Sequence, residues 1–176
     1  YFHPIVNGEI PLYEGKFMEQ FKVDSTVPES VTFDAAVRKT GDDFKTWRIG
    51  LRAVSRATDR RSLIATLFAP MMVGTHSLHM QRNASMQTVS TRIYLTGIIN
   101  SYVIDFVLRQ IVTMNVSQTF LKQLPIPLAD EFLYSDEITL LSKSLLKQNG
   151  KPYDELDKLL QDEGVMNPNK FDDLSV

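Results

Sequence analysis

Hydrophobic and polar residues alternate most regularly over residues 47–53. The apolar residues take every second position there, which is the period of a strand with one buried face. The polar segment 57–61 then breaks the alternation, and an apolar run over residues 62–68 follows before Pro70. The pattern predicts two strands joined by a polar turn.

The segments around these two strands are less regular. Residues 1–21 read as strand, turn and strand, and Pro11 restricts the second of these to a sheet edge or to its own first residues. Residues 22–45 are polar and predict a long loop with one short element. Residues 71–90 predict a strand that runs into a loop.

Residues 94–111 give the clearest helical pattern. Asp105 and Arg109 form an acid–base pair four residues apart, on the face opposite an apolar stripe. The pattern predicts one long core helix, buried along residues spaced three and four apart, namely Leu95, Ile98, Ile99, Tyr102, Val103, Phe106 and Val107.

The character of the chain changes after Ala129. Ser135 suits the N-cap of a helix that ends near Gly150, and Pro152 suits the first turn of a second helix that ends before Gly164. The sequence therefore predicts a main domain over residues 1–128 and a helical C-terminal appendage over residues 129–176, standing apart from the sheet.

Together these elements predict an α+β fold. A twisted mixed or antiparallel sheet would pack on the long core helix, with the helical appendage beside it. The expected strands lie in the segments around residues 2–21, 47–54, 62–73 and 118–127.

Composition narrows the classes of protein that fit. The chain has 176 residues, of which 43% are hydrophobic, so it can bury a sizeable core. It has no cysteine, which excludes disulfides and thiolate metal sites and fits a reducing cytoplasm. No apolar run approaches the ~18 residues of a membrane span, and no signal peptide opens the chain. Because it begins Tyr1-Phe2-His3, we expect it to be part of a longer protein.

Charge is distributed unevenly. Residues 1–37 and 129–176 are acidic, with net charges of −4 and −6, whereas residues 38–128 have a net charge of +8. A positive middle segment in an otherwise acidic chain predicts a polyanionic partner. Its densest part contains a single acid, Asp59, and five arginines: Arg48, Arg52, Arg56, Arg60 and Arg61.

Several segments resemble one known family. These are PLYEGKFMEQF (11–21), WRIGLRAVSRATDRRSLIATLFAPMMVGTHSL (47–78), IINSYVIDFVLRQ (98–110) and FLKQLPIP (120–127). Their order and spacing are similar to the TaqI-like C-terminal specificity domain of bacterial adenine-specific DNA methyltransferases, including single-chain type II restriction–modification enzymes.

The resemblance implies a target-recognition domain for double-stranded DNA. It implies a partner, the methyltransferase domain that would precede it in the parent chain and would bind S-adenosylmethionine, so we expect no cofactor in this chain. With the charge pattern, it gives nine candidate DNA-binding residues: Lys16, Arg48, Arg52, Arg56, Arg60, Arg61, Arg82, Lys122 and Gln123.

Motifs for catalysis are missing from the sequence. The Asn/Asp-Pro-Pro-aromatic motif that positions a flipped adenine is absent, because Asn167-Pro168 is followed by Asn169. The glycines are too dispersed to form a glycine-rich cofactor loop. Glu14-Gly15-Lys16 matches only half of a nuclease signature, and His76 and His79 lack further metal ligands nearby in sequence. We therefore expect no methyl transfer, no cleavage and no metal site in this chain.

The arginines leave alternatives open. Arg60 and Arg61, at the predicted turn, suit phosphate contacts, whereas Arg48 and Arg52 suit fixed bidentate contacts with guanine or phosphate. One of these strand arginines can instead be a structural ion-pair partner, and Lys16 can be a solvated strand-end lysine. Trp47 fits a core position better than a base-stacking one. The basic face can also be a protein–protein docking surface for an acidic partner or for the parent's own catalytic domain.

Overall fold

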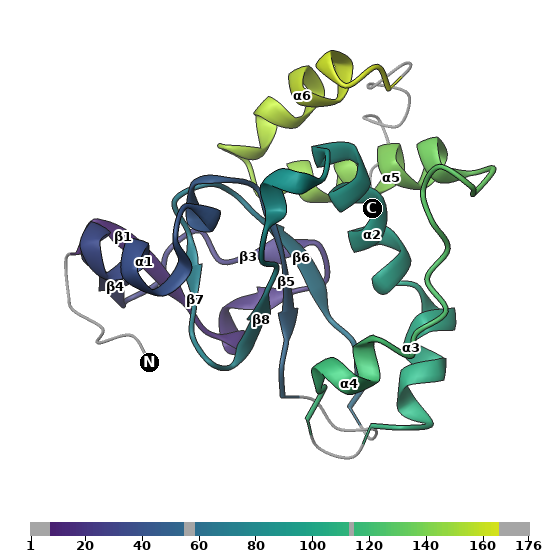
Figure 1. Cartoon of the computed structure of the whole chain (residues 1–176), viewed down its shortest axis with the longest axis horizontal. Helices are drawn as coiled ribbons and strands as arrows, with labels where there is room; N and C mark the ends of the chain where they lie inside the picture. Colours follow the sequence, from purple (N-terminus) through teal and green to yellow (C-terminus); the bar gives the residue numbers. More distant parts are fainter. Residues whose placement is uncertain (1–7, 55–58, 113–114, 166–176) are drawn as a thin grey trace.

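The computed structural model describes residues 8–54, 59–112 and 115–165, and it has the α+β fold that the sequence predicts (Figure 1). Three small sheets occupy the centre and left of Figure 1, and most of the helices lie above and to the right of them. Within the described ranges, no helix combines the length and the apolar character that crossing a membrane requires.

The central sheet has the strand order β6-β5-β8. Strand β5 (Arg48–Arg52) pairs antiparallel with β6 (Ala65–Phe68) and with β8 (Leu78–Met80). The register places Arg48 opposite Phe68 and Leu51 opposite Ala65. The predicted pair of strands is therefore confirmed.

The second three-stranded sheet has the order β4-β1-β7, with bounds Ser30–Val31, Ile10–Tyr13 and Val73–Gly74. Pro11 is the second residue of β1, but β1 is the middle strand and not an edge. The missing N–H is tolerated because pairing with β7 starts only at Leu12, after the proline. A two-stranded ribbon follows, formed by β2 (Met18–Glu19) and β3 (Lys22–Val23).

Residues 22–45 are more ordered than predicted, because β3, β4, a helix and a 3-10 turn (Asp43–Lys45) lie among them. The helix is α1 (Phe33–Thr40). The Thr32 hydroxyl accepts a hydrogen bond from the Ala35 N–H at its start, and Gly41 ends it with a φ of 61°. Only Ala36 of this helix is fully buried, so the sequence has no apolar stripe that would have predicted the helix.

The predicted helix over residues 94–111 is two helices. Helix α2 (Val89–Ile99) starts earlier, at the Thr88 cap, and α3 (Tyr102–Arg109) starts at Ser101, whose hydroxyl accepts from the Ile104 N–H. The break reverses the expected faces of the second half. Tyr102, Val103 and Phe106 are exposed, whereas Asp105 is buried.

Residues 118–127 do not form the predicted strand. The segment begins with a single helical turn, α4 (Gln118–Leu121), after a Ser117 cap. No strand occurs between Ser117 and Pro127, a stretch that the structure describes in full. The polar and apolar residues that alternate here belong to a turn that is only partly buried. In the residues from Lys122 to Pro127, Leu124 is the one that is fully buried.

The C-terminal segment is helical as predicted, with α5 (Ser135–Lys147) and α6 (Leu156–Asp162). The predicted starts are wrong, because Tyr134 and not Ser135 is the N-cap of α5, and Pro152 precedes a 3-10 turn (Tyr153–Glu155) and not α6. It does not stand apart from the sheet. Helix α5 packs on α2 so closely that a Cβ on Gly97 would lie 2.2 Å from the Ser142 hydroxyl. The division into units at residue 128 stays a prediction, but both sides of it contribute to one hydrophobic cluster.

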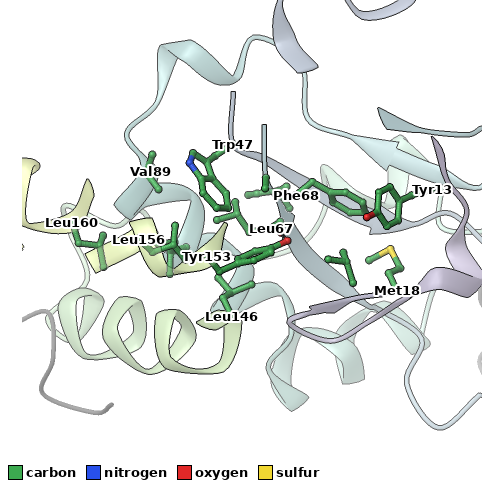
Figure 2. Packing of buried hydrophobic residues seen from close by; sticks show 14 of the residues in the cluster. Tyr13, Met18, Trp47, Leu67, Phe68, Val89, Leu146, Tyr153, Leu156 and Leu160 are labelled. Atoms are coloured by element: carbon green, nitrogen blue, oxygen red, sulfur yellow. Dashed lines mark hydrogen bonds between the residues drawn. The ribbon is translucent and has the colours of Figure 1, made fainter. Parts of the chain in front are cut away.

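Tyr153 joins the C-terminal segment to the central sheet. Its ring packs edge-on against Trp47, with a centroid distance of 5.3 Å, and lies between Trp47 and Leu146 (Figure 2). Its hydroxyl donates a 2.7 Å hydrogen bond to the Leu67 carbonyl of β6. Burial raises the pKa of the Tyr153 hydroxyl, which therefore stays protonated and donates across the ordinary pH range. Trp47 is a core residue, as its position in the alternating strand predicted.

We expect Tyr153→Phe to lower the free energy of unfolding by about 1–2 kcal/mol, because the buried Leu67 carbonyl loses its donor while the ring packing remains. Urea denaturation of the two proteins measures this difference. Tyr134→Phe is the matched control, since Tyr134 is 58% exposed, and it should change stability by less than about 0.5 kcal/mol. Equal effects of the two substitutions would contradict the structural role of Tyr153.

Candidate nucleic-acid interface

Both faces of β5 are covered, so its arginines do not form a solvent-facing ridge. Trp47 and Ile49 pack towards the helices, and Arg48 and Arg52 lie on the other face with Gly50 between them. A Cβ on Gly50 would lie 2.3 Å from the Phe68 ring, so that ring fills the space between the two arginines. Phe68 in turn packs edge-on against Tyr13 of β1. Arg48 is therefore buried beside Phe68, whereas Arg52 is half-buried at the other end of β5.

Arg48 is buried, with 1% of its surface exposed. Its Nη2 donates a 2.5 Å hydrogen bond to the Met72 carbonyl. Burial lowers the pKa of Arg48 to about 10, Asp43 opposes this lowering, and Arg82 adds to it. No carboxylate of the described residues lies within ion-pair distance of Arg48. Direct contact with a duplex lying over the surface is not available to this side chain in this conformation.

Arg52 and Lys16 are closer to the surface and line one small pocket of about 260 Å³. Arg52 is half-buried, and its Nη2 donates a 2.5 Å hydrogen bond to the Met18 carbonyl. Lys16 is exposed and pairs with Glu14 at 2.9 Å. The backbone of Gly15 lies close to Arg52 and to Ser77, because a Cβ there would be 3.2 Å from the Arg52 side chain and 3.3 Å from the Ser77 carbonyl.

The end of the β5–β6 pair carries a second basic region, which we call the arginine loop (residues 59–61). Arg109 of α3 donates from Nη2 to the carbonyls of Asp59 and Arg60, each at 2.6 Å. Its Nε pairs with Asp105 at 2.9 Å, so the predicted Asp105–Arg109 pair is confirmed. The Arg60 side chain itself is exposed to solvent. The hydrogen bonds from Arg109 therefore fix the loop backbone, and the Arg60 guanidinium remains accessible.

Asp105 is the buried anchor of this arrangement. One of its carboxylate oxygens accepts from the N–H groups of Ser62 and Leu63, both at 2.8 Å, and the other accepts from Arg109. It is the one acid between Arg60 and Lys122 in sequence, and 3% of its surface is exposed. Its negative charge is therefore compensated internally, and at the surface of the arginine loop the exposed Asp59 lies next to the exposed Arg60.

Arg61 connects the arginine loop to the break between α2 and α3. Its Nη2 donates to the Asn100 carbonyl, and its guanidinium lies 4.2 Å from the centre of the Tyr102 ring. The Asn100 side chain bonds both the N–H and the carbonyl of Ala65 in β6, at 2.9 and 2.8 Å. These contacts fix the position of Arg61 relative to the sheet.

Helix α3 presents three large apolar side chains to solvent. Tyr102, Val103 and Phe106 are 80%, 70% and 66% exposed. We call these residues the exposed face of α3. The entrance to α4 lies nearby, since Val54 and Asn115 form an isolated bridge beside the end of β5. Helices α3 and α4 occupy the same lower end of the molecule (Figure 1).

The other candidates occupy separate places. Arg82 is exposed, pairs with Asp43 at 3.1 Å and donates to the Lys39 carbonyl of α1, far from the arginine loop in the chain. Lys122 and Gln123 are exposed directly after α4. Arg56 lies outside the described residues. The structure therefore divides the basic residues between the arginine-loop end and the face around β1, β7 and β8.

Sequence reasoning missed the contacts of Asn100 and Tyr102 with this end, and it paired Asp105 with Arg109 but missed its bonds to the arginine-loop side of β6. Their roles depend on the break at Asn100-Ser101. Asn and Ser in the middle of an apolar helical run are poor helix formers and good caps, and this was the available signal. The contacts of Asp105 with Ser62 and Leu63 had no sequence signal, because they join segments more than 40 residues apart.

Two residues of the weak catalytic motifs contact other groups of the protein. Lys16 of the nuclease half-signature pairs with Glu14. The His79 ring contacts the Val116 carbonyl at 2.6 Å. In the parts of the chain that the structure describes, no group of three or more His, Cys, Asp or Glu side chains could bind a metal ion.

No protein-family model matches the chain, and no curated protein or solved structure matches it either.

Proposed function

We propose that this chain recognises a specific sequence in double-stranded DNA, as the target-recognition part of an N6-adenine DNA methyltransferase or restriction–modification enzyme. The chain itself is not catalytic in this proposal. A methyltransferase domain elsewhere in the parent would bind S-adenosylmethionine and carry out the transfer, in the cytoplasm of a bacterium.

The observation that carries the proposal is the arginine loop. Arg60 is exposed on a backbone fixed by Arg109, and the nearby Asp105 is buried and already bonded. An exposed cation on a fixed backbone suits phosphate contacts, which position a protein on a duplex. Lys122 and Gln123 add exposed donors after α4.

Sequence readout needs groups in fixed orientation. Arg52 meets this condition through its hydrogen bond to the Met18 carbonyl. Arg61 is also held in place, by the Asn100 carbonyl and the Tyr102 ring, but its Nε and Nη1 atoms are buried, so we do not assign it to base readout. A guanidinium positioned like that of Arg52 can form a bidentate contact with guanine, worth about 1–3 kcal/mol of discrimination.

Selection from a pool of randomised duplexes tests the proposal. We expect repeated rounds of binding to the 176-residue chain to enrich one short sequence. Arg52→Ala should then weaken binding to that sequence by about 1–3 kcal/mol while binding to unrelated duplexes changes little. Lys45→Ala is the matched control, since Lys45 is exposed and pairs with Asp42 on another segment. Failure to enrich any sequence would contradict the proposal.

A docking module is the second candidate, and the exposed face of α3 favours it. Three neighbouring apolar side chains on a surface helix are a common feature of protein–protein contacts. In this alternative, the arginine loop would contact an acidic partner or the parent's catalytic domain. Alanine substitution of Tyr102 and Phe106 would then weaken protein association and leave DNA affinity unchanged.

A further inference from the structure

A pocket in the described part of the chain lies away from the arginine loop, between α1, β1, β7 and β8, and we call it the Arg48 pocket. Its volume is about 720 Å³, within the range of small-molecule sites. Leu12, Leu78 and Met80 provide an apolar part of its wall. Leu12 and Leu78 belong to the buried core, so this part of the wall is fixed by the fold.

Arg48 is the unusual group in this wall. A buried guanidinium normally has a carboxylate partner, because burying an unpaired charge is costly. Among the described residues, Arg48 has one hydrogen-bond partner, the Met72 carbonyl at Nη2, and its buried Nε has none. Its nearest opposing charge, Asp43, pairs with Arg82 instead.

Further charged groups line the same pocket from other elements. Lys39 of α1 is exposed and forms no ion pair with any described residue. Arg82 and His76 contribute from segments on either side of β8. Two carboxylates, Glu14 and Glu29, also line the pocket. Glu14 pairs with Lys16, and Glu29 can accept hydrogen bonds from hydroxyl or amino groups of a ligand.

We propose that the Arg48 pocket binds an organic phosphate, with the phosphate at Arg48 and Lys39 and an apolar, ring-sized body against Leu12, Leu78 and Met80. The bound phosphate supplies the countercharge that Arg48 lacks. This inference does not rest on the proposed DNA function, because it concerns a different face and a ligand that can be tested without DNA.

Calorimetric titration of the full chain with AMP tests the proposal. We expect saturable binding, at least tenfold tighter than that of adenosine or of inorganic phosphate. Arg48→Met should weaken AMP binding at least tenfold. Thermal unfolding of this variant verifies that it folds, and replacing a buried unpaired charge with an apolar side chain of similar length favours that result.

A surface variant keeps the test decisive if Arg48→Met does not fold. Lys39→Ala should weaken AMP binding about threefold or more, whereas Arg38→Ala should not change it. Arg38 is an exposed neighbour on the same helix and does not line the pocket. Equal affinities of these two variants would overturn the proposal. So would the absence of saturable AMP binding, or AMP binding no tighter than adenosine or inorganic phosphate.

Competition identifies the source of the phosphate. If duplex DNA displaces AMP, and Lys39→Ala weakens both ligands, the site accepts nucleotides of a DNA strand. If DNA binds without displacing AMP, the ligand is a free organic phosphate. Both results support the site and differ only in where its ligand comes from.

Discussion

Asp105→Ala is expected to lower the free energy of unfolding by about 3 kcal/mol. The substitution leaves the buried N–H groups of Ser62 and Leu63 without an acceptor and removes the partner of Arg109. Unsatisfied buried donors cost about 1–3 kcal/mol each, and breaking a buried charge pair costs more when the remaining charge is buried too. The expected loss lies at the lower end of the summed free-energy costs, because the Arg109 side chain is 28% exposed and can reach water. Urea denaturation measures the loss.

Arg109→Ala separates the two parts of this effect. It removes the ion pair and the bonds to the carbonyls of Asp59 and Arg60, but the bonds from Asp105 to the N–H groups remain. We expect a loss of about 1 kcal/mol, with weaker DNA binding because the arginine loop is no longer fixed. A fully stable Asp105→Ala protein would contradict the buried role of Asp105.

Replacing Arg60 and Arg61 together by alanine is expected to weaken binding to all duplexes similarly. Each lost phosphate contact should reduce the slope of log K against log salt concentration by roughly 0.9, so the slope should fall by up to about two. Fluorescence anisotropy over a series of salt concentrations measures it. Thermal unfolding accompanies the titration, because Arg61 also donates to the Asn100 carbonyl.

The matched control for this pair removes two positive charges elsewhere. Lys151 and Lys158 are exposed in the C-terminal segment, and their double alanine variant has the same change in net charge. Its salt slope should remain that of the unsubstituted chain. If both double variants reduce the slope equally, long-range charge explains the binding, and the arginine loop is not a phosphate contact.

Local patterns predicted the elements whose partners are close in sequence. The β5–β6 pair follows from alternation and the Asp105–Arg109 pair from an i,i+4 spacing, whereas the C-terminal helices were predicted with starts that differ from the observed ones. The Ser and Thr residues that cap α1, α2, α3 and α4 were also visible in the sequence. They were outweighed by hydrophobic periodicity, which continues through Asn100-Ser101 although the helix does not.

Contacts between distant segments were the part that the sequence could not predict. The sequence pattern does not distinguish Arg48 from Arg60. In the structure β1, β7 and the Phe68 ring cover the face of β5 that carries Arg48, whereas nothing in the described structure covers Arg60. The exposed face of α3 was predicted to be core for the same reason. An apolar stripe records which residues share a face, and the packing partner decides whether that face is buried.

Competition between two duplexes tests the central claim, sequence-specific recognition of double-stranded DNA, most directly. A labelled duplex carrying the selected sequence is bound to the chain at fixed salt and displaced by unlabelled duplex, either of the same sequence or scrambled with the same composition. We predict that the scrambled duplex requires at least about tenfold more DNA to displace half of the label, since one mismatched base pair already costs about 1–3 kcal/mol. Equal displacement by both duplexes would contradict the account and leave a basic surface without sequence recognition.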